Sequence, residues 1–179
     1  MAVGLLVVAL VTLAELFAIS TRTNQGARYT TSTAVLAEQK MEQLRGLAWG
    51  FDMLGLPLTD LTTNVGAFEA TGECAAATGG AAVGLSPSPA GSLATSTDGY
   101  VDYVDMNGCG LGGGATPPAG TAYIRRWSIE PLPTNPNNTV ILQVLVTRRP
   151  NRGAQASADP VMRLPEEARL ISVKTRKTT

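Results

Sequence analysis

The hydrophobic pattern divides the chain into three parts, and the first is residues 1–19, where apolar side chains fill nearly every position. Glu15 is the only charged residue of this stretch. The apolar positions surround the whole helix and do not form the single stripe of a surface helix. At 1.5 Å per residue such a helix rises about 28 Å, close to the thickness of a bilayer core. We expect residues 1–21 to form a hydrophobic helix that needs lipid or protein on every side.

Three interpretations of this helix remain open: a cleaved signal peptide, a single-pass membrane anchor, and a membrane helix that later packs into a filament. A signal peptide has a basic start and a small-residue cleavage site. No Lys or Arg precedes Arg22, which disfavours that interpretation. The residues expected to contact lipid or neighbouring helices are Met1, Leu5, Leu6, Val8, Leu10, Leu13, Glu15, Leu16 and Phe17.

Residues 22–50 change to a one-sided apolar pattern. Apolar side chains recur at spacings of three and four, at Ala34, Ala37, Met41, Leu44 and Ala48. This spacing places them on one face of a helix. We therefore predict one long helix that ends near Trp49 and is loosened around residues 21–26. Its amphipathic second half is expected to pack on the sheet of the same domain.

Residues 51–179 are expected to form a globular β-rich head with long loops of Gly, Pro and Ala. The strongest strand signal is residues 138–149, where alternate apolar side chains make two faces. Further strands are expected at 99–106, 121–131 and 168–175, a short turn or strand at 51–68, and loops at 73–97 and 150–167. The turn-rich PLPTNPNN at 131–138 favours an antiparallel pair. One helix followed by strands indicates an α+β fold with an antiparallel sheet on one face of the helix.

Composition narrows the chemistry. The chain has 14 basic and 14 acidic residues, so its formal net charge is zero and no overall positive field attracts nucleic acid. It has no histidine and therefore lacks the commonest general base and the commonest metal ligand. Its two cysteines, Cys74 and Cys109, favour a disulfide formed in an oxidising compartment. In the chain-entropy description such a bridge stabilises the fold by about 3–4 kcal/mol.

Two polar or Gly-rich stretches are candidate ligand sites. Residues 109–115, CGLGGGA, do not match a nucleotide-binding pattern, and we expect a flexible loop there. Asp98, Asp102 and Asp105 with Asn107 offer oxygen ligands for a cation such as Ca²⁺, but their spacing does not fit an EF-hand. We interpret them as solvated loop carboxylates. We expect no metal, no cofactor and no enzymatic activity, since no base and nucleophile are paired.

A basic cluster of Arg125, Arg126, Arg148 and Arg149 would form if the two central strands pair. Beside aromatic side chains it would suit single-stranded nucleic acid. Adjacent arginines on a strand point to opposite faces, however, which divides the cluster. Nucleic acid is therefore a disfavoured partner. A membrane-anchored periplasmic binding module for DNA or a surface ligand remains the alternative function.

Three stretches of the chain resemble a known family. They are LAEQKMEQLRGLAW at 36–49, RRWSIEPLPTNPNNTVILQVLVTRR at 125–149 and RLPEEARLISVKTR at 163–176. An apolar helix that runs into the first of these, before a small β-rich domain, resembles the minor pilins and pseudopilins of type IV pilus and type II secretion systems. The chain is most similar to PilV-like pilus modification proteins.

The resemblance implies a long helix protruding from a globular head and a structural role without catalysis. The helix would lie in the bacterial inner membrane, with the head in the periplasm, and would then enter a filament core at the cell surface. The implied partners are other pilin subunits, inner-membrane assembly proteins and, before assembly, lipid. The implied role is to prime, cap or modify a type IV pilus, with a type II secretion pseudopilin as the close alternative.

The start of the chain departs from the family pattern. That pattern has a basic leader, a Gly cleavage site, an aromatic residue and a Glu a few residues later, and Glu15 lies too far along to match that Glu. Arg22 and Arg28 follow the helix, which by the positive-inside rule would place the head in the cytoplasm. Three explanations stay open: a truncated chain, a start codon assigned too late, and a member that is not processed. A basic leader encoded upstream of Met1 would remove the conflict.

Overall fold

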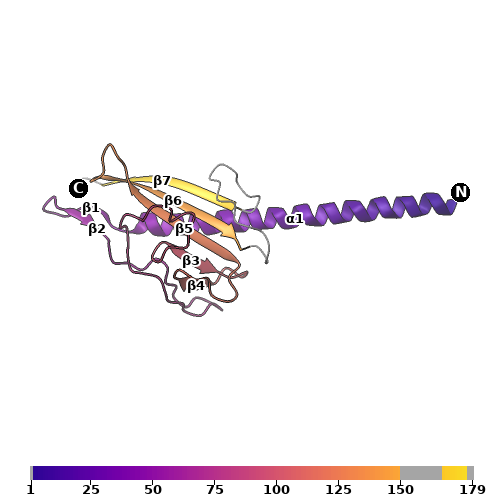
Figure 1. Ribbon diagram of the computed structural model, residues 1–179, viewed down its shortest axis with the longest axis horizontal. Helices are drawn as coiled ribbons and strands as arrows, with labels where there is room; N and C mark the ends of the chain where they lie inside the picture. Colours follow the sequence, from indigo (N-terminus) through magenta and orange to yellow (C-terminus); the bar gives the residue numbers. More distant parts are fainter. Residues whose placement is uncertain (1, 150–166, 177–179) are drawn as a thin grey trace.

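The computed structural model describes residues 2–149 and 167–176, and the side chains among them from residue 10 onward. In this part of the chain a long helix is followed by short and long strands (Figure 1). The elements are α1 (Ala2–Gly46), β1 (Trp49–Phe51), β2 (Pro57–Thr59), β3 (Val101–Val104), β4 (Gly110–Gly113), β5 (Tyr123–Pro131), β6 (Thr139–Arg148) and β7 (Glu167–Thr175). The helix projects from a head that contains all these strands (Figure 1).

The head is built on a five-stranded antiparallel sheet with the order β4-β3-β5-β6-β7. A separate antiparallel hairpin of β1 and β2 follows the helix directly. Trp127 of β5 lies opposite Val144 of β6, which lies opposite Leu170 of β7. The predicted α+β class, with a long N-terminal helix and a C-terminal antiparallel sheet, is confirmed.

The second half of α1 lies across one face of this sheet and contacts β5, β6 and β7 (Figure 1). We call the face that it covers the inner face and the opposite one the outer face. The buried helix side chains follow helical spacing: Thr33, Leu36, Ala37, Lys40, Met41 and Leu44. They pack on the alternate residues of β6 that the sequence predicted, Val140, Leu142, Val144 and Val146, and on Trp127 and Ile129 of β5. The predicted packing of stripe on sheet is confirmed.

The helix ends earlier than predicted, at Gly46, and Ala48 is exposed. Lys174 of β7 donates hydrogen bonds to the carbonyl oxygens of Arg45, at 2.6 Å, and of Leu47. A cation at a helix C-terminus satisfies carbonyl groups that have no partner inside the helix. The end of α1 is therefore set by a lysine from the last strand, which sequence spacing alone did not indicate.

The first half of α1 extends beyond the head without a break. The predicted loosening at residues 21–26 is wrong, because the helix is continuous from Ala2 to Gly46. Thr21 and Thr23 donate side-chain hydrogen bonds to the carbonyl oxygens of Phe17 and Ile19, one turn earlier. We predicted a transmembrane segment over residues 1–21. In the part of the chain that the structure describes, no helix is both long and apolar enough to cross a membrane.

The Gly-rich residues 109–115 are not the flexible loop that we predicted, because Gly110–Gly113 form strand β4. The ring of Phe68 lies against Gly110, where an added Cβ would come within 2.1 Å of a ring carbon. At Gly112, φ is +93° and an added Cβ would lie 2.0 Å from the Thr78 carbonyl oxygen. Glycine is required here because residues 68–78 cross the strand at close range.

Strands β3, β5 and β6 are present with slightly shorter bounds than predicted, and β7 begins one residue earlier than predicted. The short strand expected within residues 51–68 is β2, and its partner β1 already begins at Trp49. Strand β3 is buried on both faces. Residues 73–97 form the predicted long loop. Within the predicted loop at 150–167, residues 150–166 lie outside the described part and Glu167 begins β7. Met1 and the side chains of Leu5, Leu6 and Val8 also lie outside it.

The predicted disulfide between Cys74 and Cys109 is present, with a Cα–Cα distance of 5.3 Å. It joins the long loop to the start of β4. The loop has few apolar side chains to bury, so the bridge orders a segment that packing alone holds weakly.

We predict that replacing Cys74 and Cys109 together by serine lowers the free energy of unfolding by about 2–4 kcal/mol, because the unfolded chain regains the freedom of the closed loop. Urea unfolding of the full chain in mild detergent measures this. A reductant should move the wild-type midpoint toward that of the double variant and leave the variant unchanged. Equal midpoints for the two oxidised proteins would contradict the prediction.

Candidate functional site

The most prominent surface feature is the part of α1 that extends beyond the head. Phe17 is 65% exposed and Leu16 64% exposed. Successive helix positions are turned by about 100°, so the exposed apolar side chains point in every direction around the axis. We call this set the apolar helix surface; it comprises Leu10, Val11, Leu13, Leu16, Phe17 and Ile19. Such a helix has no covered face of its own and requires apolar surroundings on all sides.

Glu15 is the single charge within this surface. Its side chain is exposed, and it makes no ion pair with Arg22 within the described part of the chain. A carboxylate in apolar surroundings is costly unless a cation or a polar group meets it. Glu15 therefore restricts how the helix can be surrounded, because one side of it needs a polar neighbour.

Where α1 meets the sheet, three charged side chains are buried together; we call them the buried ion cluster. It comprises Lys40 of α1, Asp102 of β3 and Arg125 of β5. The Lys40 Nζ lies 2.5 Å from one carboxylate oxygen of Asp102. Arg125 donates to both oxygens of the same carboxylate, from Nε at 2.7 Å and from Nη2 at 3.0 Å. The helix and two strands thus meet at one carboxylate.

Neighbouring groups accept the remaining hydrogen bonds of the Lys40 ammonium. The Lys40 ammonium also donates to the carbonyl oxygen of Val65 at 2.7 Å and to the amide oxygen of Gln43 at 2.6 Å. It lies 4.6 Å from the centre of the Trp127 ring, within cation–π range. All three donors of the ammonium are therefore used. The cluster still carries two cations for one anion, so it holds one excess positive charge inside the protein.

Burial lowers the pKa of Lys40 from 10.5 to about 8, because the interior disfavours the charged ammonium. Asp102 opposes this effect by attraction, and Arg125 adds to it by repulsion. The group that attaches the helix to the sheet consequently titrates much closer to neutral pH than an ordinary lysine. Lys40 and its role in the cluster were not recognised from the sequence.

The four arginines proposed for nucleic acid do not come together. Arg125 is buried in the ion cluster and its neighbour Arg126 points to the outer face, as strand geometry required. The guanidinium of Arg148 lies 3.6 Å from the centre of the Tyr29 ring on α1. Arg149 is exposed at the end of β6. The structure therefore does not form the basic cluster that the alternative function needs.

The three carboxylates that we predicted to be solvated lie in different surroundings. Asp98 is exposed, but Asp102 is buried in the ion cluster, so that part of the prediction is wrong. One carboxylate oxygen of Asp105 accepts hydrogen bonds at 2.8 Å from the backbone N–H groups of Asn107 and of Cys109. Asp105 thus shapes the turn between β3 and β4. Among the described residues no group of His, Cys, Asp or Glu could hold a metal ion.

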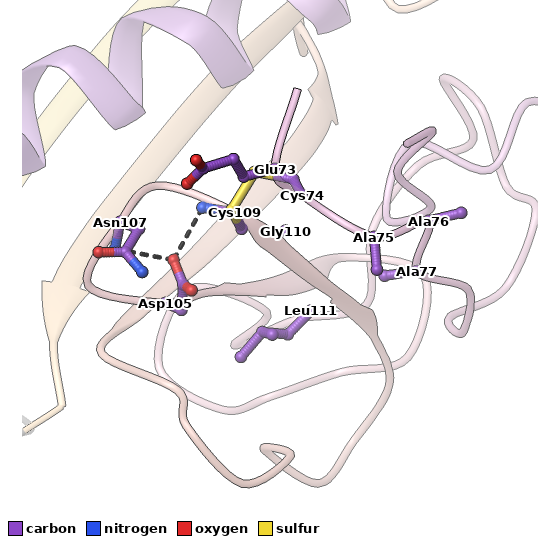
Figure 2. A pocket seen from close by; sticks show the side chains of 10 residues that line it. All are labelled: Glu73, Cys74, Ala75, Ala76, Ala77, Asp105, Asn107, Cys109, Gly110 and Leu111. Carbon is purple, nitrogen blue, oxygen red and sulfur yellow. Dashed lines mark hydrogen bonds between the residues drawn. A yellow bond between two sulfur atoms is a disulfide. The ribbon is translucent and has the colours of Figure 1, made fainter. Parts of the chain in front are cut away.

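A shallow hollow of about 350 Å³ lies beside the disulfide (Figure 2). The disulfide forms part of its wall, and Glu73, Asp105 and Leu111 also line it. The residues that line it include no lysine, arginine or histidine. Asp105 already accepts hydrogen bonds from the backbone N–H groups of Asn107 and Cys109 (Figure 2). The hollow is therefore a consequence of the loop packing.

The hairpin of β1 and β2 carries a second exposed apolar surface. Met53 is fully exposed and Leu54 is 84% exposed. One oxygen of Asp52 accepts hydrogen bonds from the backbone N–H groups of Leu54, at 2.9 Å, and of Leu56, at 2.8 Å.

Arg176 holds the two strands of this hairpin. Its guanidinium carbon lies 3.9 Å from the centre of the Trp49 ring, and the guanidinium donates to the Gly50 and Leu58 carbonyl oxygens. Apolar side chains are thus presented on a rigid turn at the end of the head opposite to the N-terminus (Figure 1).

We predict that Asp102→Asn lowers the free energy of unfolding by about 3–5 kcal/mol, because two buried cations lose their counter-charge. Glu42→Gln is the matched control. It removes a carboxylate from an exposed ion pair with Arg45 and should cost less than about 1 kcal/mol. Urea unfolding of both variants at pH 7 measures the difference. Similar small losses for both would show that the cluster does not hold the helix to the head.

We also predict that the wild type gains stability, relative to Lys40→Met, as pH rises from about 8 toward 10.5. In this window the folded protein has released the Lys40 proton while the unfolded chain still binds it, so the free energy of unfolding increases with pH. Urea unfolding across this range measures it. Arg45→Met, which removes an exposed cation one turn away, should retain the rise. A difference between wild type and Lys40→Met that stays constant with pH would contradict the prediction.

Comparison of the chain with protein-family models finds no match. Neither the curated proteins nor the solved structures give a match. Among the described residues, the structural features that bear on function are the apolar helix surface, the exposed hairpin and the buried ion cluster between helix and head.

Proposed function

We propose that the chain is a structural subunit of a type IV pilus-like filament, a minor pilin that assembles through its projecting helix. The observation that carries this proposal is the apolar helix surface, exposed around the whole circumference beyond the head. Burying a large apolar side chain stabilises by about 1.5–3 kcal/mol, so several copies of this helix packed together gain considerable free energy. The sequence resemblance to minor pilins supports the same assignment.

We also propose where in the cell the subunit lies. The subunit is held at the bacterial inner membrane by residues 1–21, with its head in the periplasm, and then enters the filament. The disulfide supports an oxidising compartment for the head. Lipid surrounds the helix first and neighbouring pilin helices surround it afterwards. Inner-membrane assembly proteins act on it in between.

The exposed hairpin of β1 and β2 supports the proposal that the heads of neighbouring subunits contact each other. Its apolar tip is exposed on a turn that hydrogen bonds hold in one shape, which lowers the entropy lost on binding. The tip and the apolar helix surface lie at opposite ends of the molecule (Figure 1). A subunit with apolar surfaces at both ends can contact one neighbour through its helix and another through its head.

We propose no catalytic activity. The most strongly interacting charged groups, those of the ion cluster, are buried and have their hydrogen bonds satisfied within the fold. Such groups are typical of structural ion pairs and give no access to a substrate. Their role in this proposal is to keep the helix in a fixed position relative to the head while the helix is loaded in a filament.

The test is recovery of the chain in sheared filaments from a piliated host bacterium. We predict that Leu16→Ser with Phe17→Ser lowers recovery at least tenfold, because losing two buried apolar side chains costs more than the roughly 1.4 kcal/mol that a tenfold change represents. Met106→Ser is the control. It makes the same kind of change at a side chain of the head that is 60% exposed, and it should leave recovery unchanged.

The outcomes separate the alternatives. Tryptophan fluorescence and the intact disulfide would show that the double variant keeps a folded head. Recovery equal to wild type would exclude assembly through the helix. A wild-type chain that is never released by shearing would favour the membrane-anchored binding module, and release that depends on type II secretion components would assign a pseudopilin.

A further inference from the structure

The outer face of the sheet carries two arginines in one cross-strand row. Arg126 of β5 lies opposite Leu145 of β6, and Leu145 lies opposite Arg169 of β7. Residues directly opposite in an antiparallel pair have their side chains on the same face, about 5 Å apart at Cβ. The two guanidinium groups therefore extend from the same face on either side of one leucine.

Among the described residues, neither guanidinium forms an ion pair. Arg126 donates to the Ser96 hydroxyl at 3.3 Å, and Arg169 donates to the amide oxygen of Gln143 at 2.5 Å. Both partners are neutral, so these hydrogen bonds orient the arginines without neutralising their charges. This differs from the inner face, where Arg125 is paired with Asp102.

Several polar atoms in this row also lack partners. The Nε atoms of Arg126 and Arg169 are buried and make no hydrogen bond, and the same holds for the hydroxyl of Ser128. Ser128 is only 3% exposed and lies two residues beyond Arg126 on the same face. Buried donors without partners cost free energy that a bound acceptor would recover. Burial also lowers the pKa of Arg126, which reflects an incompletely solvated cation.

We propose that Arg126 and Arg169, with the Ser128 hydroxyl beside them, form a binding site for a single oxyanion group, a carboxylate or a phosphate, on the outer face of the sheet. Guanidinium groups are suited to such ligands because their donors match two oxygens at once. The two neutral side chains that orient the arginines act as positioning residues.

The neighbouring charges limit the ligand to one anionic group. Glu130 lies on the same face of β5, two residues beyond Ser128, and Glu167 lies on the same face of β7, two residues before Arg169. A continuous polyanion such as nucleic acid would meet these carboxylates on both sides of the arginine row. A ligand with one isolated oxyanion, such as a sugar acid, a phosphate monoester or an acidic side chain, would avoid them.

The proposed site and α1 lie on opposite faces of the sheet. The second half of α1 covers the inner face, so the site lies on the side of the sheet away from the helix (Figure 1). Binding can be measured on the isolated full chain, and its failure would leave the filament proposal untouched.

The test is nuclear magnetic resonance of the ¹⁵N-labelled full chain in detergent, observing the Nε–H signals of its arginines. Inorganic phosphate and acetate are titrated separately, each against sodium chloride at equal ionic strength. We expect saturable shifts of the Arg126 and Arg169 signals with at least one anion, and the stronger response distinguishes a phosphate ligand from a carboxylate. The Arg125 signal, from a group already paired with Asp102, is the internal control.

Variants supply the second measurement. Arg126→Gln with Arg169→Gln should weaken the anion's effect on the thermal midpoint at least tenfold in apparent affinity, and Arg149→Gln, which removes an exposed arginine elsewhere, should not. Shifts that chloride reproduces at equal ionic strength, or a double variant that responds like wild type, would overturn the proposal. If the double variant does not fold, the wild-type titration decides alone.

Discussion

The position of α1 on the head depends on the carboxylate of Asp102, which accepts hydrogen bonds from one cation of the helix and one of the sheet. Apolar packing between a helix and a sheet tolerates some sliding, because hydrophobic contact has no direction. A buried ion cluster does not, since each ion must meet its partner within hydrogen-bond distance. Lys40 reaches Asp102 at only one axial position of the helix. The apolar stripe therefore contributes packing energy between the helix and the sheet, and the buried ion cluster fixes the axial position of the helix.

This register matters because the helix has two environments along its length. From Thr33 to Leu44 it is part of the core, whereas Leu10 to Ile19 are exposed. The ring of Tyr29 beneath Arg148 lies near the boundary between the two parts, and Lys174 holds the far end of the helix. A force applied to the exposed part is carried into the sheet through these contacts. A continuous helix without the predicted loosening transmits it without an internal hinge.

Sequence pattern predicted the elements whose side chains alternate or repeat cleanly. Strand β6 and the stripe of Ala37, Met41 and Leu44 were found because burial follows their period. The ion cluster was missed because Lys40 looked like an ordinary polar position, although it lies three residues after Ala37 and shares its face. A charge within an apolar stripe was the available signal. Its partners were beyond reach, since only the fold brings Asp102 and Arg125 opposite each other.

Strand β4 shows a different limit of sequence reasoning. Glycine runs are typical of loops, because glycine gains the most freedom when it is unfolded. Here the same residues are needed because Phe68 and the Thr78 carbonyl oxygen leave no room for a Cβ. Composition does not distinguish a glycine that is needed for backbone freedom from a glycine that is needed because a Cβ would not fit. The contact that decides comes from a loop more than thirty residues away along the chain, which the disulfide joins to this strand.

The two faces of the sheet use arginine in opposite ways, and this contrast follows from alternation along one strand. Arg125 points inward, where an uncompensated charge would be costly, and Asp102 neutralises it. Arg126 points outward and is half-buried, and among the described residues it donates to a neutral hydroxyl, that of Ser96. Adjacent residues of one type thus serve stability on one face and remain available for recognition on the other. The alternation that separates Arg125 from Arg126 therefore also leaves Arg126 on the face where we propose that an anion binds.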